Sequence, residues 1–350
     1  MKILVCSDGS ERGRRALAFA AIIAEATKAE ITILGISELR KQQAKLLEVL
    51  AREREVLHRP DLSLQIATKF GDPVEEIIRR TQETAYQLVV IGAERKGSEG
   101  FFLPSAKAYS ITESITPPVL VVPVARAALR RILICTGGGI YIANAVNFTS
   151  KLAKDLAAEV TLLTVTTQPA AMHGTLYRRQ ENVDALLNSN SALARNLRNQ
   201  KQIIERMGVP VTVRVRHGMV IDQILAEIEE HDYDLVVAGS WPARDTWRTY
   251  VIGNITRQIV NLTDRPVLVV RSTIGLTSFI ERLRHIMKAM KGKQDYMPYA
   301  PCVADAPTQT LSPRTVLARK NYSPRKSAWS LRASPGNGST ELAEVLRGFC

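Results

Sequence analysis

The sequence predicts two doubly wound α/β domains in tandem, each built on a five-stranded parallel sheet, followed by a basic tail. Two observations support this fold class. The chain repeats itself in order, and short apolar segments rich in β-branched residues alternate with segments of helical periodicity. Strands that are apolar on both faces are typical of a parallel sheet covered by helices on both sides. Their alternation with helices indicates crossover connections and therefore a doubly wound sheet.

The internal repeat consists of three pairs of similar segments that occur in the same order in each half. The pairs are residues 2–10 with 131–139, residues 71–93 with 218–240, and residues 117–123 with 264–271. Ordered similarity of this kind indicates a duplicated folding unit. Between its first and second segments the second copy is 18 residues longer than the first. We expect this insertion near residues 167–185.

Five strands and four helices are expected in the first copy. The strands are 3–6, 31–36, 64–69, 88–91 and 119–122, and the helices are 14–26, 38–57, 74–84 and 106–115. On the core side of the helix over 38–57 the helical period places Leu39, Leu46, Leu47 and Leu50. The second copy is expected to have strands near 132–135, 160–165, 211–216, 235–238 and 267–270.

The candidate binding residues follow the first and the fourth strand of each copy. Ligands of doubly wound sheets bind beyond the carboxyl ends of the strands, near the point where the strand order reverses. In the first copy these positions hold Asp8, which supplies a carboxylate, and Gly92. In the second copy three glycines over 137–139 follow the first strand, and Gly239 with Ser240 follows the fourth.

A further candidate is the pair Gly253-Asn254, which opens the last helix of the second copy. Glycine lets the backbone approach a phosphate closely, and a helix N-terminus supplies unpaired N–H donors and a favourable dipole. The alternative interpretation of each glycine is an ordinary tight turn between a strand and a helix.

The two halves resemble the universal stress protein (UspA) family, once each, over about residues 1–272. The segments that carry the resemblance are ILVCSDGS before an alanine-rich helix, LVVIG and LVVAG before a loop, and GNITRQIVNLTDRPVLVV. The resemblance implies an adenine nucleotide alpha hydrolase-like fold whose domains pair through the last strand, within the chain in tandem members. It also implies a role in stress response or signalling without a defined catalytic reaction.

Many members of this family bind ATP through an aspartate after strand one and a loop of the form G-x-x-G, nine residues, then G-S or G-N. The resemblance assigns cofactor-binding roles to Asp8, Gly92, Gly239, Ser240, Gly253, Asn254 and Ile255. Both copies depart from the motif. Arg95 and Pro242 replace the second glycine, residues 105–106 replace the closing pair of the first copy, and Gly137 replaces the aspartate of the second. Neither half therefore carries a complete nucleotide motif.

The net charge of +13 suggests an anionic partner. Residues 274–350 hold 12 Lys+Arg and 5 Asp+Glu, so the tail carries about half of this excess. The tail begins with an amphipathic stretch over 276–290. After it the chain is rich in Pro, Ser, Arg and Lys and shows no hydrophobic period, so a largely disordered segment is predicted. A basic tail of this kind can contact nucleic acid or anionic lipid nonspecifically. The alternative is a solvated tail without a dedicated partner.

Cysteine and histidine usage predicts neither disulfides nor a metal site. Cys6 and Cys135 fall in apolar strands, where buried, reduced thiols are expected, and no CxxC pair occurs. The five histidines form no HxxxH or HExxH pair. No apolar run approaches the ~20 residues that span a bilayer. These features predict a cytoplasmic protein.

We therefore expect universal stress protein domains over 1–126 and 127–273 and a tail over 274–350, with the two domains paired within the chain and a homodimer as a further assembly. The leading hypothesis is a non-enzymatic stress-response or signalling protein that binds ATP or AMP weakly. The first alternative is a partner-binding scaffold whose nucleotide sites have decayed. A slow nucleotide hydrolase is the third hypothesis, and it has the least support because no base or metal ligand is evident.

Overall fold

A computed structural model describes the protein over residues 1–57, 62–93, 105–124, 126–166, 183–240 and 255–272. All of these residues belong to one compact unit of the chain. Most of the expected insertion near 167–185 lies outside the described residues. The amphipathic stretch over 276–290 and the rest of the tail also lie outside them.

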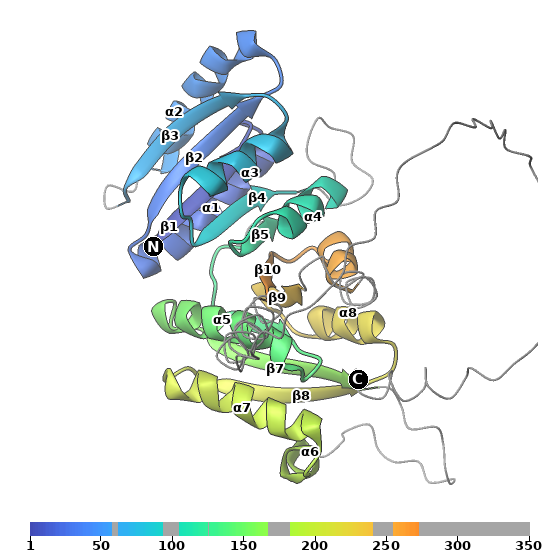
Figure 1. The fold of residues 1–350 in the computed structure, drawn as a ribbon. Helices are drawn as coiled ribbons and strands as arrows, with labels where there is room; N and C mark the ends of the chain where they lie inside the picture. The colour runs from blue at the N-terminus through green and yellow to red at the C-terminus, as the bar shows by residue number, and fades with distance from the viewer. Residues whose placement is uncertain (58–61, 94–104, 125, 167–182, 241–254, 273–350) are drawn as a thin grey trace, which may run out of the picture. The chain divides into compact units, whose positions relative to one another are not determined.

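Strands and helices alternate through the first half in the predicted order (Figure 1). The strands are β1 (Lys2–Ser7), β2 (Glu30–Ser37), β3 (Leu64–Phe70), β4 (Leu88–Gly92) and β5 (Val119–Val122). The helices are α1 (Glu11–Thr27), α2 (Gln43–Leu57), α3 (Pro73–Glu83) and α4 (Ser105–Ser114), with a 3₁₀ turn over Arg40–Gln42 before α2.

The second half repeats this alternation. The strands are β6 (Arg131–Cys135), β7 (Glu159–Thr166), β8 (Val211–His217), β9 (Leu235–Ser240) and β10 (Val267–Arg271). The helices are α5 (Ala143–Asp155), α6 (Val183–Asn188), α7 (Ala192–Arg206) and α8 (Val220–Glu230), with a 3₁₀ turn over Ile140–Ile142 before α5 and a further helix over 255–262.

One ten-stranded sheet runs through both halves in the order β3-β2-β1-β4-β5-β10-β9-β6-β7-β8. Within each half the neighbouring strands are parallel. The last strands of the two halves, β5 and β10, pair antiparallel, with Val119 opposite Val269 and Val121 opposite Val267 (Figure 1). The predicted fold of two doubly wound, five-stranded parallel sheets is confirmed.

Helices cover both faces of this sheet. On one face the core includes Leu17 of α1 and Leu50 of α2, together with side chains of α5 and α7 from the second half. On the other face the core includes Ile77 of α3, Ile111 of α4 and Ile224 of α8. Inner strands such as β1, β4, β5 and β9 are buried on both sides, which explains why their sequences are almost continuously apolar. The edge strands β3 and β8 are only partly buried and carry polar side chains.

Short polar side chains begin several of the helices. The Ser10 hydroxyl accepts a hydrogen bond from the Gly13 N–H at 3.3 Å at the start of α1. One carboxylate oxygen of Asp72 accepts from the Val74 N–H at 2.9 Å at the start of α3. Such caps satisfy N–H groups that have no partner within the helix. The cap at Ser10 also holds the chain where β1 turns into α1, next to the candidate site.

One part of the expected packing of α2 is wrong. Leu46 and Leu50 are buried as predicted, but Leu39 and Leu47 are 48% and 44% exposed. Leu39 precedes the 3₁₀ turn, which changes the phase of the chain before the α-helix begins. Leu47 lies about 100° around the helix from Leu46, outside the stripe that Leu46 and Leu50 form.

Candidate functional site

A cavity of about 570 Å³ lies at the carboxyl ends of β1, β2 and β4 in the first half. Cavities of roughly 300–1,000 Å³ are typical of small-molecule sites. β1 is the strand at which the order reverses, since β2 and β3 follow on one side and β4 and β5 on the other. The cavity is therefore at the position where doubly wound sheets bind ligands.

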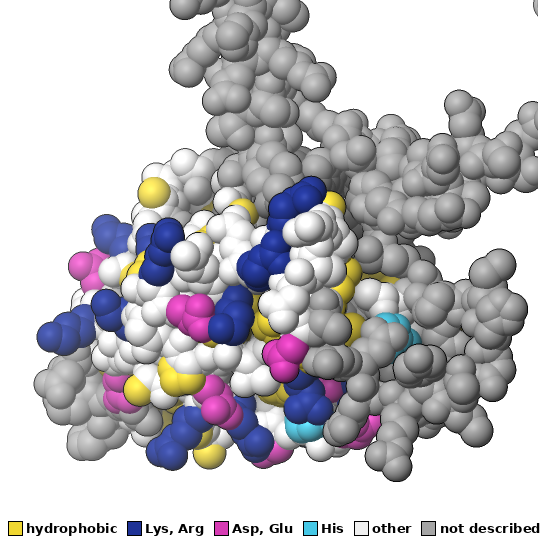
Figure 2. All heavy atoms as spheres, turned by 90° about the horizontal axis from the view of Figure 1, so that it is seen from below, with side chains coloured by type: hydrophobic (Ala, Val, Ile, Leu, Met, Phe, Trp, Pro, Cys, Tyr) yellow, Lys and Arg dark blue, Asp and Glu magenta, His cyan; other side chains and the backbone are white. Residues whose placement is uncertain are grey.

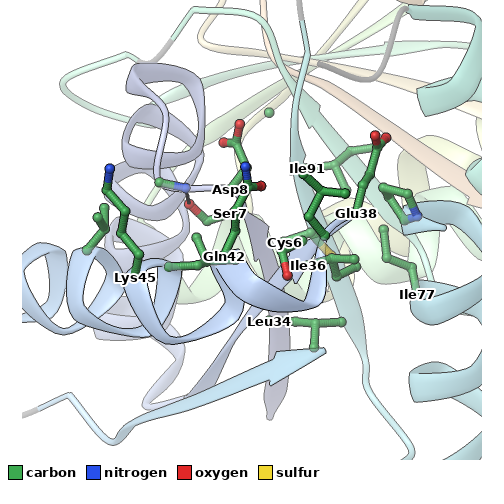
Figure 3. A pocket seen from close by; sticks show the side chains of 17 residues that line it. Cys6, Ser7, Asp8, Leu34, Ile36, Glu38, Gln42, Lys45, Ile77 and Ile91 are labelled. Atoms are coloured by element: carbon green, nitrogen blue, oxygen red, sulfur yellow. Dashed lines mark hydrogen bonds between the residues drawn. The ribbon is translucent and has the colours of Figure 1, made fainter. Parts of the chain in front are cut away.

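The floor of the cavity is apolar, and its polar groups gather at the mouth (Figure 3). Leu34, Ile36, Ile77 and Ile91 line it from β2, α3 and β4. In Figure 3 the carboxylates of Asp8 and Glu38 point toward the same end of the cavity, away from Leu34. An apolar slot with a few polar groups at one end suits a flat ring that is joined to a polar group.

The wall next to β1 is apolar in spite of the thiol of Cys6. Burial raises the pKa of this thiol to about 12, so that the sulfur stays protonated at neutral pH. Cys135 is the corresponding residue of the second half, and burial raises the pKa of its thiol to about 12 as well. The negative charge of Glu227 raises this pKa further. Both cysteines are free, as expected.

Asp8 is held by the tight turn that links β1 to α1. The Gly9 N–H donates to the Ser7 hydroxyl at 3.2 Å, and the Ser10 N–H donates to Oδ1 of Asp8 at 2.9 Å. Gly9 has a φ of +78°, and a Cβ there would lie 2.7 Å from Cγ1 of Val49. Glycine is therefore required in this turn, which sets the direction of the Asp8 side chain.

Gly92 closes the opposite wall of the cavity, at the end of β4. A Cβ at this position would lie 2.8 Å from the carbonyl oxygen of Arg12. The glycine thus lets β4 approach the first turn of α1. The structure brings Asp8 and Gly92 to one cavity, as residues that follow the two neighbouring strands β1 and β4.

The corresponding turn of the second half has a similar backbone conformation, but a different side chain lies at the position of the Asp8 carboxylate. Gly138 has a φ of +69°, and its N–H donates to the Thr136 hydroxyl at 3.0 Å, as Gly9 does to Ser7. A Cβ on Gly137, which takes the place of Asp8, would lie 2.6 Å from the hydroxyl oxygen of Tyr141. The side chain of Tyr141 therefore fills the place where the first half holds a carboxylate.

The remaining predicted site residues belong to the second half. A Cβ on Gly239 would lie 2.7 Å from Cδ1 of Ile142, so this strand end is also covered by a side chain of the same half. The Ser240 residue is buried, and its carbonyl oxygen accepts the Ser272 N–H at 2.8 Å. Ile255 is half-buried at the start of the helix over 255–262. Gly253 and Asn254 lie outside the described residues.

The sequence motifs did not point to the cavity residues that α2 and the segment before it supply. Glu38, Gln42 and Lys45 line the mouth of the cavity, and Glu53 is buried behind the Asp8 turn. Glu38 and Gln42 precede α2, and Lys45 and Glu53 lie on it. All four belong to a charged segment whose polar side chains are expected on a solvated face. The internal repeat could have indicated Glu53, because the offset that aligns residue 71 with residue 218 also aligns Glu53 with Gln200.

Basic side chains of the described residues are distributed among acidic ones. On the face shown in Figure 2, lysine and arginine side chains alternate with aspartate and glutamate. Near the link between the halves, Arg265 and Arg131 contact Asp232 at 3.1 and 3.3 Å, and Arg126 contacts the same carboxylate. The expected contact of the tail with nucleic acid or lipid concerns residues outside the described ones and stays a prediction.

In the described part of the chain, no group of three or more His, Cys, Asp or Glu side chains is arranged to hold a metal ion. None of the helices described is both long enough and apolar enough to cross a membrane.

The fold and the cavity define a tandem doubly wound α/β protein with a cavity beyond the carboxyl ends of the strands in its first half. The chain belongs to the universal stress protein family, because a sequence model of this family matches residues 1–123 and again residues 128–271. The resemblance inferred from the sequence is thereby confirmed, including its tandem form.

Solved structures share the fold of both halves. A universal stress protein from Archaeoglobus fulgidus DSM 4304 is 18% identical, with a TM-score of 0.59 over 77% of this chain and 98% of its own. A functionally unknown protein from Pseudomonas aeruginosa PAO1 is also 18% identical, with a TM-score of 0.56 over 81% of this chain and 96% of its own. No curated protein sequence matches the chain.

Proposed function

We propose that this protein is a cytoplasmic, non-enzymatic stress-response or signalling protein that binds an adenine nucleotide, ATP or AMP, weakly in the cavity of its first half. The observation that carries the proposal is the cavity of about 570 Å³ with an apolar floor and the Asp8 carboxylate at its mouth. It lies at the reversal of strand order, where doubly wound sheets bind nucleotides.

The chemistry of the cavity fits a nucleoside. A planar base would pack between aliphatic side chains such as Ile36 and Ile77, and ribose hydroxyls would donate to the carboxylate of Asp8. The Lys45 side chain, which also lines the cavity, supplies one positive charge for a phosphate. Because Asp8 and Glu38 bring two carboxylates to the same mouth, we expect affinity for the phosphorylated ligand to be weak.

The proposed site is in the first half alone. The Tyr141 hydroxyl lies where the second half would need a carboxylate, and Ile142 covers Gly239. We therefore expect one nucleotide per chain. In this proposal Gly239, Ser240 and Ile255 have structural roles in place of the cofactor-binding roles that the family motif suggests.

The absence of catalysis is part of the proposal and has a physical basis in the cavity described. The Cys6 thiol is not a nucleophile while its pKa is near 12. The carboxylates of Asp8 and Glu38 point toward the same end of the cavity (Figure 3), and no group of three or more His, Cys, Asp or Glu side chains among the described residues is arranged to hold a metal ion. A binding role therefore fits the cavity better than hydrolysis of the nucleotide.

Titration calorimetry of the full chain with ATP and with AMP tests this proposal. We expect a single site with a Kd in the micromolar to millimolar range, and at least a tenfold loss of affinity in Asp8→Ala. The tenfold loss corresponds to about 1.4 kcal/mol, which is typical of one hydrogen bond to a charged group. Asp155→Ala, at an exposed aspartate that ends α5, is the matched control and should bind as the wild type does.

The second candidate function is a partner-binding scaffold without a nucleotide. The observation that favours it is the filled second half, in which Tyr141 and Ile142 occupy the strand ends. No heat and no thermal shift at millimolar ATP or AMP would exclude the nucleotide site and leave the scaffold. Equal affinity in Asp8→Ala and the wild type would place the nucleotide elsewhere in the chain.

A further inference from the structure

Glu53 is a buried acidic side chain directly behind the turn that carries Asp8. It lies on α2, and only 6% of the residue is exposed. The Ser7 hydroxyl donates to its Oε2 at 3.4 Å, a long hydrogen bond. Its Oε1 is buried without a hydrogen-bond partner among the described residues. An ionised carboxylate in this position would lack most of the hydrogen bonds that water gives it.

The charges around Glu53 do not compensate for this burial. Arg14 of α1 favours the ionised form, but its guanidinium also binds Glu11, with Nε 3.0 Å from Oε2. Asp8 and Glu11 face Glu53 with negative charge. Burial is the largest influence, and it raises the pKa of Glu53 from 4.5 to about 7.

The second half has a residue that cannot ionise at the position equivalent to Glu53. In the repeat register Glu53 corresponds to Gln200. The Thr136 hydroxyl donates to Oε1 of Gln200 at 3.0 Å, as Ser7 does to Glu53, and Gln200 is also buried. Its Nε2 donates to the carbonyl oxygen of Gly139 at 3.4 Å. A neutral side chain with one donor and one acceptor is therefore sufficient to hold this turn.

The register is supported by packing as well as by sequence. A Cβ on Gly9 would lie 3.6 Å from Cδ1 of Leu46, and a Cβ on Gly138 would lie 2.1 Å from Cδ1 of Leu193. Leu46 and Leu193 are equivalent in the same register as Glu53 and Gln200. The amide nitrogen of Gln200 thus marks the place where a protonated Glu53 would carry its hydrogen.

We propose that Glu53 is a positioning residue for the Asp8 turn and that it holds the turn as the neutral acid. Its ionisation weakens the binding of an anionic ligand, so that affinity falls as pH rises. Ionisation places a negative charge behind Asp8. It also removes the proton of Glu53, whereas Gln200, the equivalent residue of the second half, always keeps its N–H donors. The coupling to ligand rests on the proposed function. The proton site itself does not, since it depends only on the burial of Glu53 and its contact with Ser7.

Thermal unfolding of the full chain as a function of pH tests the proton site without any ligand. The folded protein holds the Glu53 proton up to about pH 7, whereas the unfolded chain loses it near pH 4.5. The stability that the neutral acid contributes is therefore present below pH 4.5 and is lost as pH rises to about 7. In Glu53→Gln this loss is absent. The Tm difference between Glu53→Gln and the wild type should widen by about 5 °C or more from pH 5 to pH 8.

Two further variants make the result specific. Glu48→Gln removes an exposed carboxylate from the same helix and should follow the wild-type pH profile. Gln200→Glu moves the titrating group to the second half and should give a second loss of Tm above pH 5. This variant also keeps the test decisive if Glu53→Gln folds poorly.

The coupling to ligand is measured with AMP at pH 6 and pH 8. The affinity of the wild type relative to Glu53→Gln should fall about threefold or more over this range, because titration of the AMP phosphate affects both proteins equally. Parallel Tm profiles of the wild type and Glu53→Gln would overturn the proton site. A constant affinity ratio would overturn the coupling alone. Diverging Tm profiles with no AMP binding by either protein would support the proton site and overturn the proposed function.

Discussion

At Gly13 a single hydrogen atom decides how closely α1 can approach β1. A Cβ at this position would lie 2.2 Å from the hydroxyl oxygen of Ser7 and 3.3 Å from its Cα. Ser7 is the residue that links the Asp8 turn to Glu53. The packing of one glycine therefore supports the backbone on which the candidate site is built.

Gly13→Ala should destabilise the protein although alanine favours helices. In an open helix the change would stabilise by about 1 kcal/mol. Here the methyl group must displace Ser7, and we expect a net loss of about 2 kcal/mol. Urea unfolding measures the difference, and Ala18→Gly, at an exposed position of α1, provides the scale of helix propensity alone. An increase in the free energy of unfolding would show that α1 can move away from β1 at little cost.

At the level of the element, α8 is fixed to β8 by a buried carboxylate. Glu227 is fully buried, with Oε1 2.9 Å from Nε of Arg214 and Oε2 2.5 Å from Nε of Arg216. The Tyr233 hydroxyl donates to Oε1 at 2.7 Å. In the first half the equivalent of Glu227 is Arg80, which contacts the equivalent tyrosine, so the two halves hold this helix with opposite charges.

Glu227→Ala should destabilise the protein, because the Tyr233 hydroxyl and the largely buried Arg216 lose a buried acceptor, although Arg216 keeps its contact with Glu230 and Arg214 reaches solvent. A buried donor that loses its hydrogen-bond partner costs about 1–3 kcal/mol. Glu229→Ala, at an exposed neighbour on the same helix, should change the free energy of unfolding by about 0.5 kcal/mol or less. Denaturant unfolding of both variants measures the contrast. Similar small losses in the two would mean that water reaches Arg214 and Arg216 once the carboxylate is gone.

At the scale of the whole molecule, the two halves share a sheet and both of its cores. β5 and β10 pair at the centre of the strand order, and each core cluster contains side chains from both halves. Leu120 of β5 lies opposite Leu268 of β10, and both are 1% exposed. We therefore infer that neither half can unfold without exposing the end strand of the other.

Leu120→Ala and Leu268→Ala should each lower one common unfolding transition. Truncation of a buried leucine costs about 2–5 kcal/mol, partly through the cavity that it leaves. Calorimetry should show a single endotherm that shifts down in both variants, whereas Leu47→Ala, at a half-exposed leucine of α2, should shift it little. Two endotherms, of which each variant moves only one, would show that the halves unfold independently.

Local patterns in the sequence were sufficient for the strands, for most of the helices and for the tandem repeat, but not for the start of α2 or for α6. Continuous apolar runs such as those of β4 and β5 identify strands buried on both faces, and each has a counterpart in the second half. The carboxylate of Asp8 could be predicted for the same reason, since it follows β1 directly. These features depend on residues close together in the chain, so their physical requirements are visible in its order.

Contacts between distant residues were decided only by the tertiary structure. The burial of Glu53 beside Ser7 joins positions 46 residues apart. The exclusion of Leu47 from the core depends on where α2 begins, and the place of Tyr141 over Gly137 depends on how the turn before α5 folds back. Packing geometry determines such contacts, and the hydrophobic period of the sequence carries no information about that geometry. The sequence thus determined the architecture and Asp8, while the fold decided which side chains cover Gly137 and Gly239 and which acid lies buried behind the Asp8 turn.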